Sequence, residues 1–195
     1  MNLKYYVLYK PYGYLSQFTD EGGHPGLNQL ITIPKDVYAV GRLDHDSEGL
    51  LLLSNDRQLN KNLLDPVQEH ERTYWVLLDG AVSELALERL RKGVLISLSG
   101  STYQTLPARV SLMDEPELPE RSVRVRVRKN IPVTWISLTL IEGKNRQVRR
   151  MSAMVGHPTL RLVRYAIEDL SLDGMQPGDL KELNANLIHK KLHLS

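Results

Sequence analysis

The feature that most constrains the fold of this chain is a change in the spacing of its apolar residues, from the two-residue period of a β-strand to the period of an α-helix. Apolar residues occupy every second position in residues 123–128 and 135–141, which predicts β-strands. Residues 144–155 change to the spacing of an amphipathic helix, and Gly156 is a natural stop. Strand and helix patterns occur in mixed order, with several strand–turn–strand passages. The sequence therefore predicts an α+β fold with a mainly antiparallel sheet flanked by helices, rather than a doubly wound parallel sheet.

Shorter patterns predict further elements. Four leucines at residues 50–53 indicate a strand that is buried on both faces. Asn55 or Asp56 can cap a helix in which Leu59, Leu63 and Leu64 share one face. The remaining expectations are strands at residues 5–9, 37–40, 73–78 and 96–98, a helical turn at 27–31, a helix from an N-cap at Ser83 to Gly93, and a Pro-broken acidic loop at 114–120.

Composition excludes several kinds of protein. The 195 residues are enough for one ordinary domain or for two small lobes that share a core. The absence of cysteine excludes disulfides, Cys-ligated zinc, iron–sulfur clusters and thiol nucleophiles, and it fits a reducing compartment. The longest aliphatic run has four residues, far short of a membrane span, and residues 1–11 lack the pattern of a signal peptide. We therefore expect a soluble cytoplasmic protein with no membrane contact.

Charge is unevenly distributed along the chain. The net charge is +2, but residues 121–164 hold eleven Lys/Arg and a single acid, Glu142. A strand at residues 123–128 would place Arg124, Arg126 and Arg128 on one face. Segregation of this kind predicts a cationic surface and a polyanionic partner. The alternatives are a solvated surface without a partner and an exposed strand edge whose charges deter aggregation.

The densest cluster of chemically useful side chains lies at residues 41–49. Asp44, Asp46 and Glu48 have the spacing of the first half of a calcium loop, but the leucines that follow and Asn55 at the twelfth position do not fit the second half. His189 and His193 have no third metal ligand nearby, and a frayed C-terminal tail is the expectation there. No metal site is therefore expected. Asp44 could instead act as a nucleophile or general base at a sugar carbon.

The motifs together resemble the RsuA-type bacterial rRNA pseudouridine synthases. The resemblance covers residues 5 to 183 and is closest to the RluE branch, which lacks an S4-type RNA-binding domain and acts on large-subunit rRNA. It implies a single catalytic domain over residues 1–195, with two lobes that could meet near residues 70–80 and a central active-site cleft, and without an N-terminal S4 domain. It is carried by Gly41-Arg42-Leu43-Asp44 with residues 46–51, Lys10-Pro11, Arg72-Thr73-Tyr74, residues 142–151 and Leu162-Val163-Arg164-Tyr165.

The resemblance also implies a reaction and roles for individual residues. A uridine within RNA is isomerised to pseudouridine without cofactor or metal, in a protein expected to be a monomer. The substrate is rRNA, 23S rather than 16S, or a ribosomal assembly intermediate. Asp44 matches the essential aspartate, Tyr74 the tyrosine that stacks on the base, and Arg149 the basic residue that pairs with the aspartate. Residues expected to bind RNA are Arg42, which would fill the gap left by the flipped base, and Lys10, Arg124, Arg126, Arg128, Lys144, Arg146, Arg150 and Arg164.

Two other functions fit parts of the sequence. A non-catalytic RNA-binding or ribosome-assembly protein on the same scaffold would show the same charge segregation, but it has no use for a carboxylate that faces a polyanion. The second alternative is a sugar-acting hydrolase built on Asp44 and a second acid. The basic stretch makes a neutral glycan a poor match for that second function.

Overall fold

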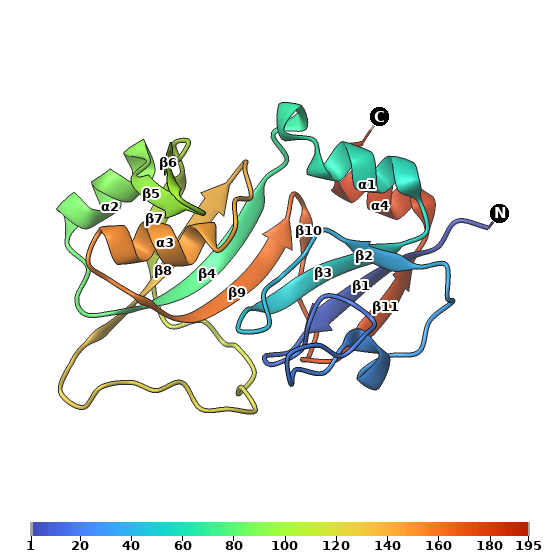
Figure 1. Cartoon of the computed structure of the whole chain (residues 1–195), viewed down its shortest axis with the longest axis horizontal. Helices are drawn as coiled ribbons and strands as arrows, with labels where there is room; N and C mark the ends of the chain where they lie inside the picture. The colour runs from blue at the N-terminus through green and yellow to red at the C-terminus, as the bar shows by residue number, and fades with distance from the viewer. Residues whose placement is uncertain (1, 195) are drawn as a thin grey trace. The chain divides into compact units, whose positions relative to one another are not determined.

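The computed structural model describes residues 2–194 and contains two compact units (Figure 1). Residues 2–70 and 163–194 form the first, which we call the terminal unit, and residues 71–162 form the second, the central unit. In each unit the strands pair mainly antiparallel and helices pack on them, which confirms the predicted α+β class. No helix within residues 2–194 has the length and apolar character needed to cross a bilayer.

The terminal unit is built around strand β3 (Glu48–Ser54), whose seven residues are all buried. β1 (Tyr5–Lys10) pairs antiparallel with β3, and β11 (Leu180–Leu183) pairs antiparallel with β1. β3 also pairs with β2 (Tyr38–Val40) and, in parallel, with β9 (Thr159–Ile167) at Val163 and Arg164, while β10 (Leu170–Ser171) pairs with β9. The remaining elements are η1 (Leu27–Gln29), α1 (Arg57–Leu64), η2 (Pro66–Gln68) and α4 (Ala185–Lys191). The four-leucine run thus lies in a fully buried strand, as predicted.

In the central unit, β8 (Val133–Leu140) is flanked by β4 (Arg72–Asp79) and β7 (Arg109–Met113), all antiparallel. β5 (Leu95–Leu98) and β6 (Ser101–Gln104) form a separate hairpin. Helices α2 (Glu84–Lys92) and α3 (Gln147–Met154) share one hydrophobic core with β4 and β8, which includes Leu90, Met151 and Ile136. Burial of this shared core is the main force that holds α3 against the sheet.

The predicted helix ends are confirmed where capping chemistry is strong. The Asp56 carboxylate accepts hydrogen bonds from the N–H groups of Gln58 and Leu59, and the Ser83 hydroxyl accepts one from Ala86. α2 ends at Gly93, whose φ of 85° favours glycine and where a Cβ would lie 2.2 Å from a backbone oxygen. The buried face of α1 is narrower than expected, because Leu59 and Leu63 are buried but Leu64 is 47% exposed.

Three predictions of secondary structure are wrong. Residues 123–128 form no strand; they lie in the long irregular segment between β7 and β8 (Figure 1), where Val123 is 54% exposed. α3 begins at Gln147 rather than near Lys144, because Arg146 has a left-handed φ of 50°. The C-terminal tail is not frayed: it contains α4, and Ile188 on that helix is fully buried.

Candidate functional site

The turn between β2 and β3 carries Asp44 in the terminal unit. The Ser47 N–H donates to the Asp44 carbonyl at 3.0 Å and closes the turn. At Gly49, with φ of 114°, β3 approaches β9 so closely that a Cβ would lie 2.4 Å from the Arg164 carbonyl oxygen. Only glycine fits there, which explains the glycine that follows the acidic cluster. Asp44 is half-buried in this turn, ahead of the first residue of β3.

Both neighbours of Asp44 are held by the segment that follows β1. The buried Ser16 hydroxyl donates to the Leu43 carbonyl at 2.7 Å and accepts from the Leu43 N–H at 2.9 Å. The Gly13 N–H donates to the His45 carbonyl at 2.7 Å, and the His45 ring stacks on the His24 ring with centroids 4.0 Å apart. Ser16 was not predicted as a site residue, because a lone serine in a loop gives no signal of a contact 27 residues away.

Lys10 is fully buried, and its ammonium group donates to the carbonyls of Pro11 at 3.0 Å and Tyr14 at 2.7 Å. Burial lowers the pKa of Lys10 to about 7, an effect that the negative charges of Glu48 and nearby aspartates oppose. The structure does not support the predicted RNA contact of Lys10, because the side chain presents no surface to a phosphate. It holds instead the segment that contacts the Asp44 turn.

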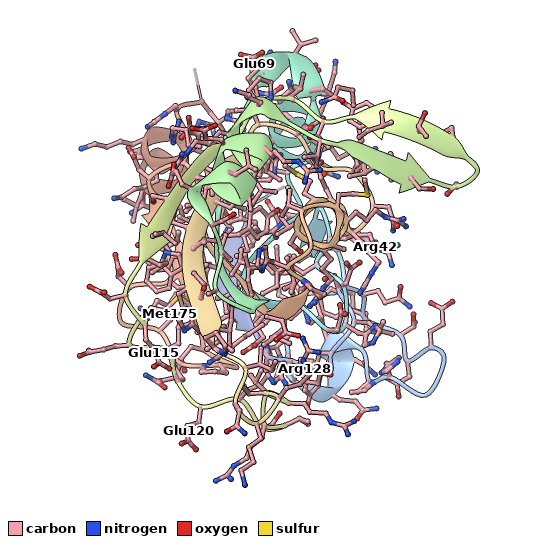
Figure 2. The ribbon with its side chains drawn as sticks, turned by 90° about the vertical axis from the view of Figure 1, so that its left-hand side faces the viewer. Arg42, Glu69, Glu115, Glu120, Arg128 and Met175 are labelled. Carbon is pink, nitrogen blue, oxygen red and sulfur yellow. The ribbon has the colours of Figure 1, made fainter. Side chains whose placement is uncertain are left out.

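Arg164 is also buried, at 4% exposure, and does not fit the predicted RNA contact. Its guanidinium donates to the carbonyls of Leu50 at 2.8 Å and Arg42 at 3.4 Å, so it connects β9 to both ends of the Asp44 turn. The Arg42 side chain is exposed (Figure 2), as expected for a residue that meets RNA.

Tyr74 and Arg149 both belong to the central unit, whereas Asp44 belongs to the terminal unit. Tyr74 lies on β4 opposite Leu138 and, at 9% exposure, is a buried member of the core that β4 shares with α3. Arg149 lies on α3 and donates to the Thr159 carbonyl at 3.4 Å. The tyrosine and the arginine therefore come from two elements that are held together by one hydrophobic core.

The first turn of α3 is organised by the carboxylate of Glu142, the single acid of the basic stretch. This buried side chain accepts hydrogen bonds from the Tyr103 hydroxyl at 2.6 Å, the Leu106 N–H at 2.8 Å and the Gln147 amide at 2.6 Å. The ring of the same Tyr103 also contacts Lys144, whose ammonium lies 4.8 Å from the ring centre. Glu142 is thus a structural anchor for the backbone that carries the predicted RNA-binding cations.

The cations of the α3 region differ in their exposure and in their hydrogen bonds to the rest of the fold. Lys144 is exposed and Arg146 is half-buried at the N-cap. Arg150 donates to the Ser97 carbonyl at 2.6 Å and to both the backbone and the side chain of Asn145, so part of its guanidinium is occupied by the fold.

Arg124, Arg126 and Arg128 are exposed on the irregular segment between β7 and β8. Glu115 and Glu120 lie earlier on the same segment, and Figure 2 labels both of them and Arg128. Arg128 is tethered to the structure, because its guanidinium lies 2.5 Å from the Asp79 carboxylate at the end of β4. The three arginines do not share one face of a strand, which corrects the predicted geometry, but all three remain accessible to an anion.

The two units differ in charge. The central unit holds fifteen Lys/Arg and nine Asp/Glu residues, and the terminal unit holds ten and fourteen. The excess of positive charge is thus on the unit with Tyr74 and Arg149. Within residues 2–194, no group of three His, Asp or Glu side chains is arranged to hold a metal ion.

Comparison with known proteins gives a consistent result. A profile of the RNA pseudouridylate synthase family matches residues 4–154. A "Ribosomal large subunit pseudouridine synthase E" of Vibrio parahaemolyticus is 52% identical over 93% of this chain and 74% of that protein, and one of Xanthomonas axonopodis is 49% identical over 88% and 89%. A solved structure described as a pseudouridylate synthase has a TM-score of 0.80 at 28% identity and covers 98% of this chain and 74% of its own.

Proposed function

Because this chain belongs to the RNA pseudouridylate synthase family, we propose that it converts a specific uridine of large-subunit ribosomal RNA to pseudouridine. The observation that carries the proposal is the family match over residues 4–154, which include Asp44, Tyr74 and Arg149. The relatives that are 46–52% identical to this chain are all named for activity on the large ribosomal subunit, which supports the choice of RNA.

The reaction is an isomerisation that leaves the RNA chain intact. The C1′–N1 bond of the uridine breaks, the uracil turns, C5 forms a bond to C1′, and the proton on C5 is lost while N1 gains one. We assign Asp44 either as the nucleophile that attacks C1′ or as the base that removes the C2′ proton to give a glycal intermediate, a proton that C2′ regains when C5 bonds to C1′. Asp44 is only half-buried in the turn that precedes β3, which supports this assignment. The atoms balance without an added reagent.

Tyr74 and Arg149 complete the proposed catalytic set. An aromatic ring against the uracil face holds the base during rotation without fixing its edge, and the Tyr74 hydroxyl is a candidate to take the C5 proton. Arg149 is the proposed partner of the aspartate, since a nearby guanidinium favours the ionised carboxylate that a nucleophile requires.

RNA binding must offset the cost of unstacking the target base, which is a few kcal/mol. We assign this to exposed or half-buried cations: Arg42, Arg124, Arg126, Arg128, Lys144, Arg146 and the accessible part of Arg150. Lys10 and Arg164 are left out because both are buried. The positive charge of the central unit supports this assignment, since phosphate contacts dominate affinity for RNA.

The test is to map pseudouridine in unmodified 23S and 16S transcripts after incubation with the protein and with Asp44→Asn. We expect one new carbodiimide-dependent reverse-transcription stop in 23S RNA with the wild type and none with the variant, at similar RNA affinity. Asp46→Asn, two residues further along the same turn, is the matched control and should retain turnover.

Pseudouridine formation by Asp44→Asn would contradict the role of the aspartate. RNA binding without pseudouridine formation on transcripts or precursor subunits would favour the non-catalytic RNA-binding alternative. The 23S preference, a monomeric state and a cytoplasmic location, where ribosomal RNA is processed in bacteria, belong to the same proposal. Analytical ultracentrifugation tests the monomeric state.

A further inference from the structure

We propose that Ser16 is a positioning residue for Asp44, and that its hydroxyl sets the rate of the chemical step rather than the affinity for RNA. The inference rests on the proposed function of Asp44. Its geometric basis is the pair of hydrogen bonds that one side chain makes to both backbone groups of Leu43, the residue immediately before the aspartate.

The two bonds fix the peptide groups on both sides of Leu43. The Ser16 hydroxyl accepts the Leu43 N–H at 2.9 Å and donates to the Leu43 carbonyl at 2.7 Å, and Ser16 is only 7% exposed. The carbonyl of Leu43 belongs to the peptide that contains the Asp44 nitrogen, so a rotation there would swing the carboxylate. Water has little access to replace the hydroxyl, and its loss would leave two buried backbone groups without their partner.

A second contact holds the other side of the aspartate. The Gly13 N–H donates to the His45 carbonyl at 2.7 Å, so the residues before and after Asp44 are both attached to the 11–16 segment. That segment is itself fixed, because the buried Lys10 ammonium donates to two of its carbonyls and the Leu15 N–H donates to the Pro25 carbonyl at 2.9 Å. Ser16 therefore attaches the Asp44 turn to a segment whose own position is fixed.

A nucleophile must be held close to its attack geometry, and a displacement of about 1 Å can cost on the order of 100-fold in rate. Binding of the RNA, in contrast, depends on phosphate contacts made elsewhere. Loss of the Ser16 hydroxyl should consequently lower kcat and leave KM unchanged. A merely structural serine would change neither in a protein that is still folded.

The chain contains a matched control in the same unit. Ser54, on β3, is 5% exposed, and its hydroxyl donates to the Lys4 carbonyl at 2.7 Å and accepts from the Asp56 N–H at 3.0 Å. It thus makes the same two kinds of bond as Ser16 with similar burial, but at the opposite end of the strand. Ser54→Ala should lower the melting temperature about as much as Ser16→Ala does.

The experiment compares single-turnover rates, KM and melting temperatures of the wild type, Ser16→Ala, Ser16→Thr and Ser54→Ala on the mapped RNA. We expect kcat of Ser16→Ala to fall roughly 10- to 100-fold at unchanged KM, kcat to recover at least in part in Ser16→Thr, and wild-type kcat in Ser54→Ala. If Ser16→Ala does not fold, Ser16→Cys takes its place, and its weaker hydrogen bonds should still lower kcat.

Two results would overturn the positioning role alone: wild-type kcat in folded Ser16→Ala, or an equal loss of kcat in Ser16→Ala and Ser54→Ala. An equal loss would mean that the rate follows stability and not the geometry of the turn. Absence of pseudouridine with the wild type on every RNA tested would instead overturn the proposed function, and the role of Ser16 with it.

Discussion

At the scale of single residues, the buried Lys10 makes the stability of the protein depend on pH. Its pKa is lowered to about 7 by burial, from 10.5 in the unfolded chain. Between these values the unfolded state binds one more proton than the folded state, so the free energy of unfolding rises with pH over this range. The slope from one such group is at most about 1.4 kcal/mol per pH unit. Urea denaturation should show that the free energy of unfolding increases more from pH 7.5 to pH 9.5 in the wild type than in Lys10→Met.

The matched control for this prediction is Lys4→Met. Lys4 is part-exposed and donates to Glu182 at 2.6 Å, which raises its pKa, so its removal should leave the slope between pH 7.5 and 9.5 unchanged. Measurements stay below pH 10 because the pKa values of Tyr5 and Tyr165 are raised to about 12 and give the opposite slope above that point. Equal slopes in the wild type and Lys10→Met would show that the lysine stays charged in the fold.

At the scale of elements, the irregular segment between β7 and β8 is expected to contact RNA through its exposed arginines. Each phosphate contact contributes about 0.7 to 0.9 to the slope of log affinity against log salt. Arg124→Gln combined with Arg126→Gln should weaken RNA binding and make this slope shallower by about 1.4 to 1.8. Fluorescence anisotropy with a labelled RNA over a range of salt concentrations measures both quantities. Arg128 is kept, because it also pairs with Asp79.

The control for the Arg124/Arg126 double variant removes the same number of positive charges from a different element, α1. Arg57→Gln combined with Lys61→Gln removes two exposed cations from α1, on the unit in which acidic residues are in excess. The salt slope of that variant should match the wild type. An unchanged slope in the segment variant would mean that the arginines only keep the surface soluble.

At the scale of the whole molecule, the C-terminal helix is attached to the β9–β10 turn by charged side chains. The His193 ring lies 2.7 Å from the Asp169 carboxylate and 3.5 Å from that of Glu168. The hydrogen bond from His193 lowers the pKa of Asp169. The ionised Asp169 carboxylate therefore stabilises the fold fully above pH 3.8, the pKa of the unfolded chain. This stabilisation is lost as the pH falls through the lower pKa that Asp169 has in the folded protein.

Asp169→Asn should consequently be less stable than the wild type near pH 6 and no less stable once the pH is below the folded pKa of the aspartate. Thermal unfolding followed by circular dichroism at several pH values measures the difference. Asp114→Asn is the control, because Asp114 is exposed and takes part in none of the ion pairs found within residues 2–194. A difference that persists unchanged into acid would contradict the role of the carboxylate charge.

Prediction from the sequence worked where the signal was local. Ser83 and Asp56 cap their helices as expected because a capping bond spans only two or three residues. It failed where an element depends on a distant partner. β11 has little apolar pattern, and it forms because β1, from the other end of the chain, offers an edge on which Leu183 pairs with Tyr5. Residues 123–128 have the alternation of a strand, but no described strand pairs with them.

The sequence by itself therefore determined the family, the α+β class, the buried leucine strand and the turn that carries Asp44, because each depends on the order and spacing of neighbouring residues. Only the tertiary structure decided which cations stay accessible and which side chains hold that turn. Lys10 and Arg164 were predicted from the sequence to bind RNA, yet both are buried and donate hydrogen bonds to backbone carbonyls. Ser16 gave no signal at all, because its contact with Leu43 exists only after segments 27 residues apart have packed together.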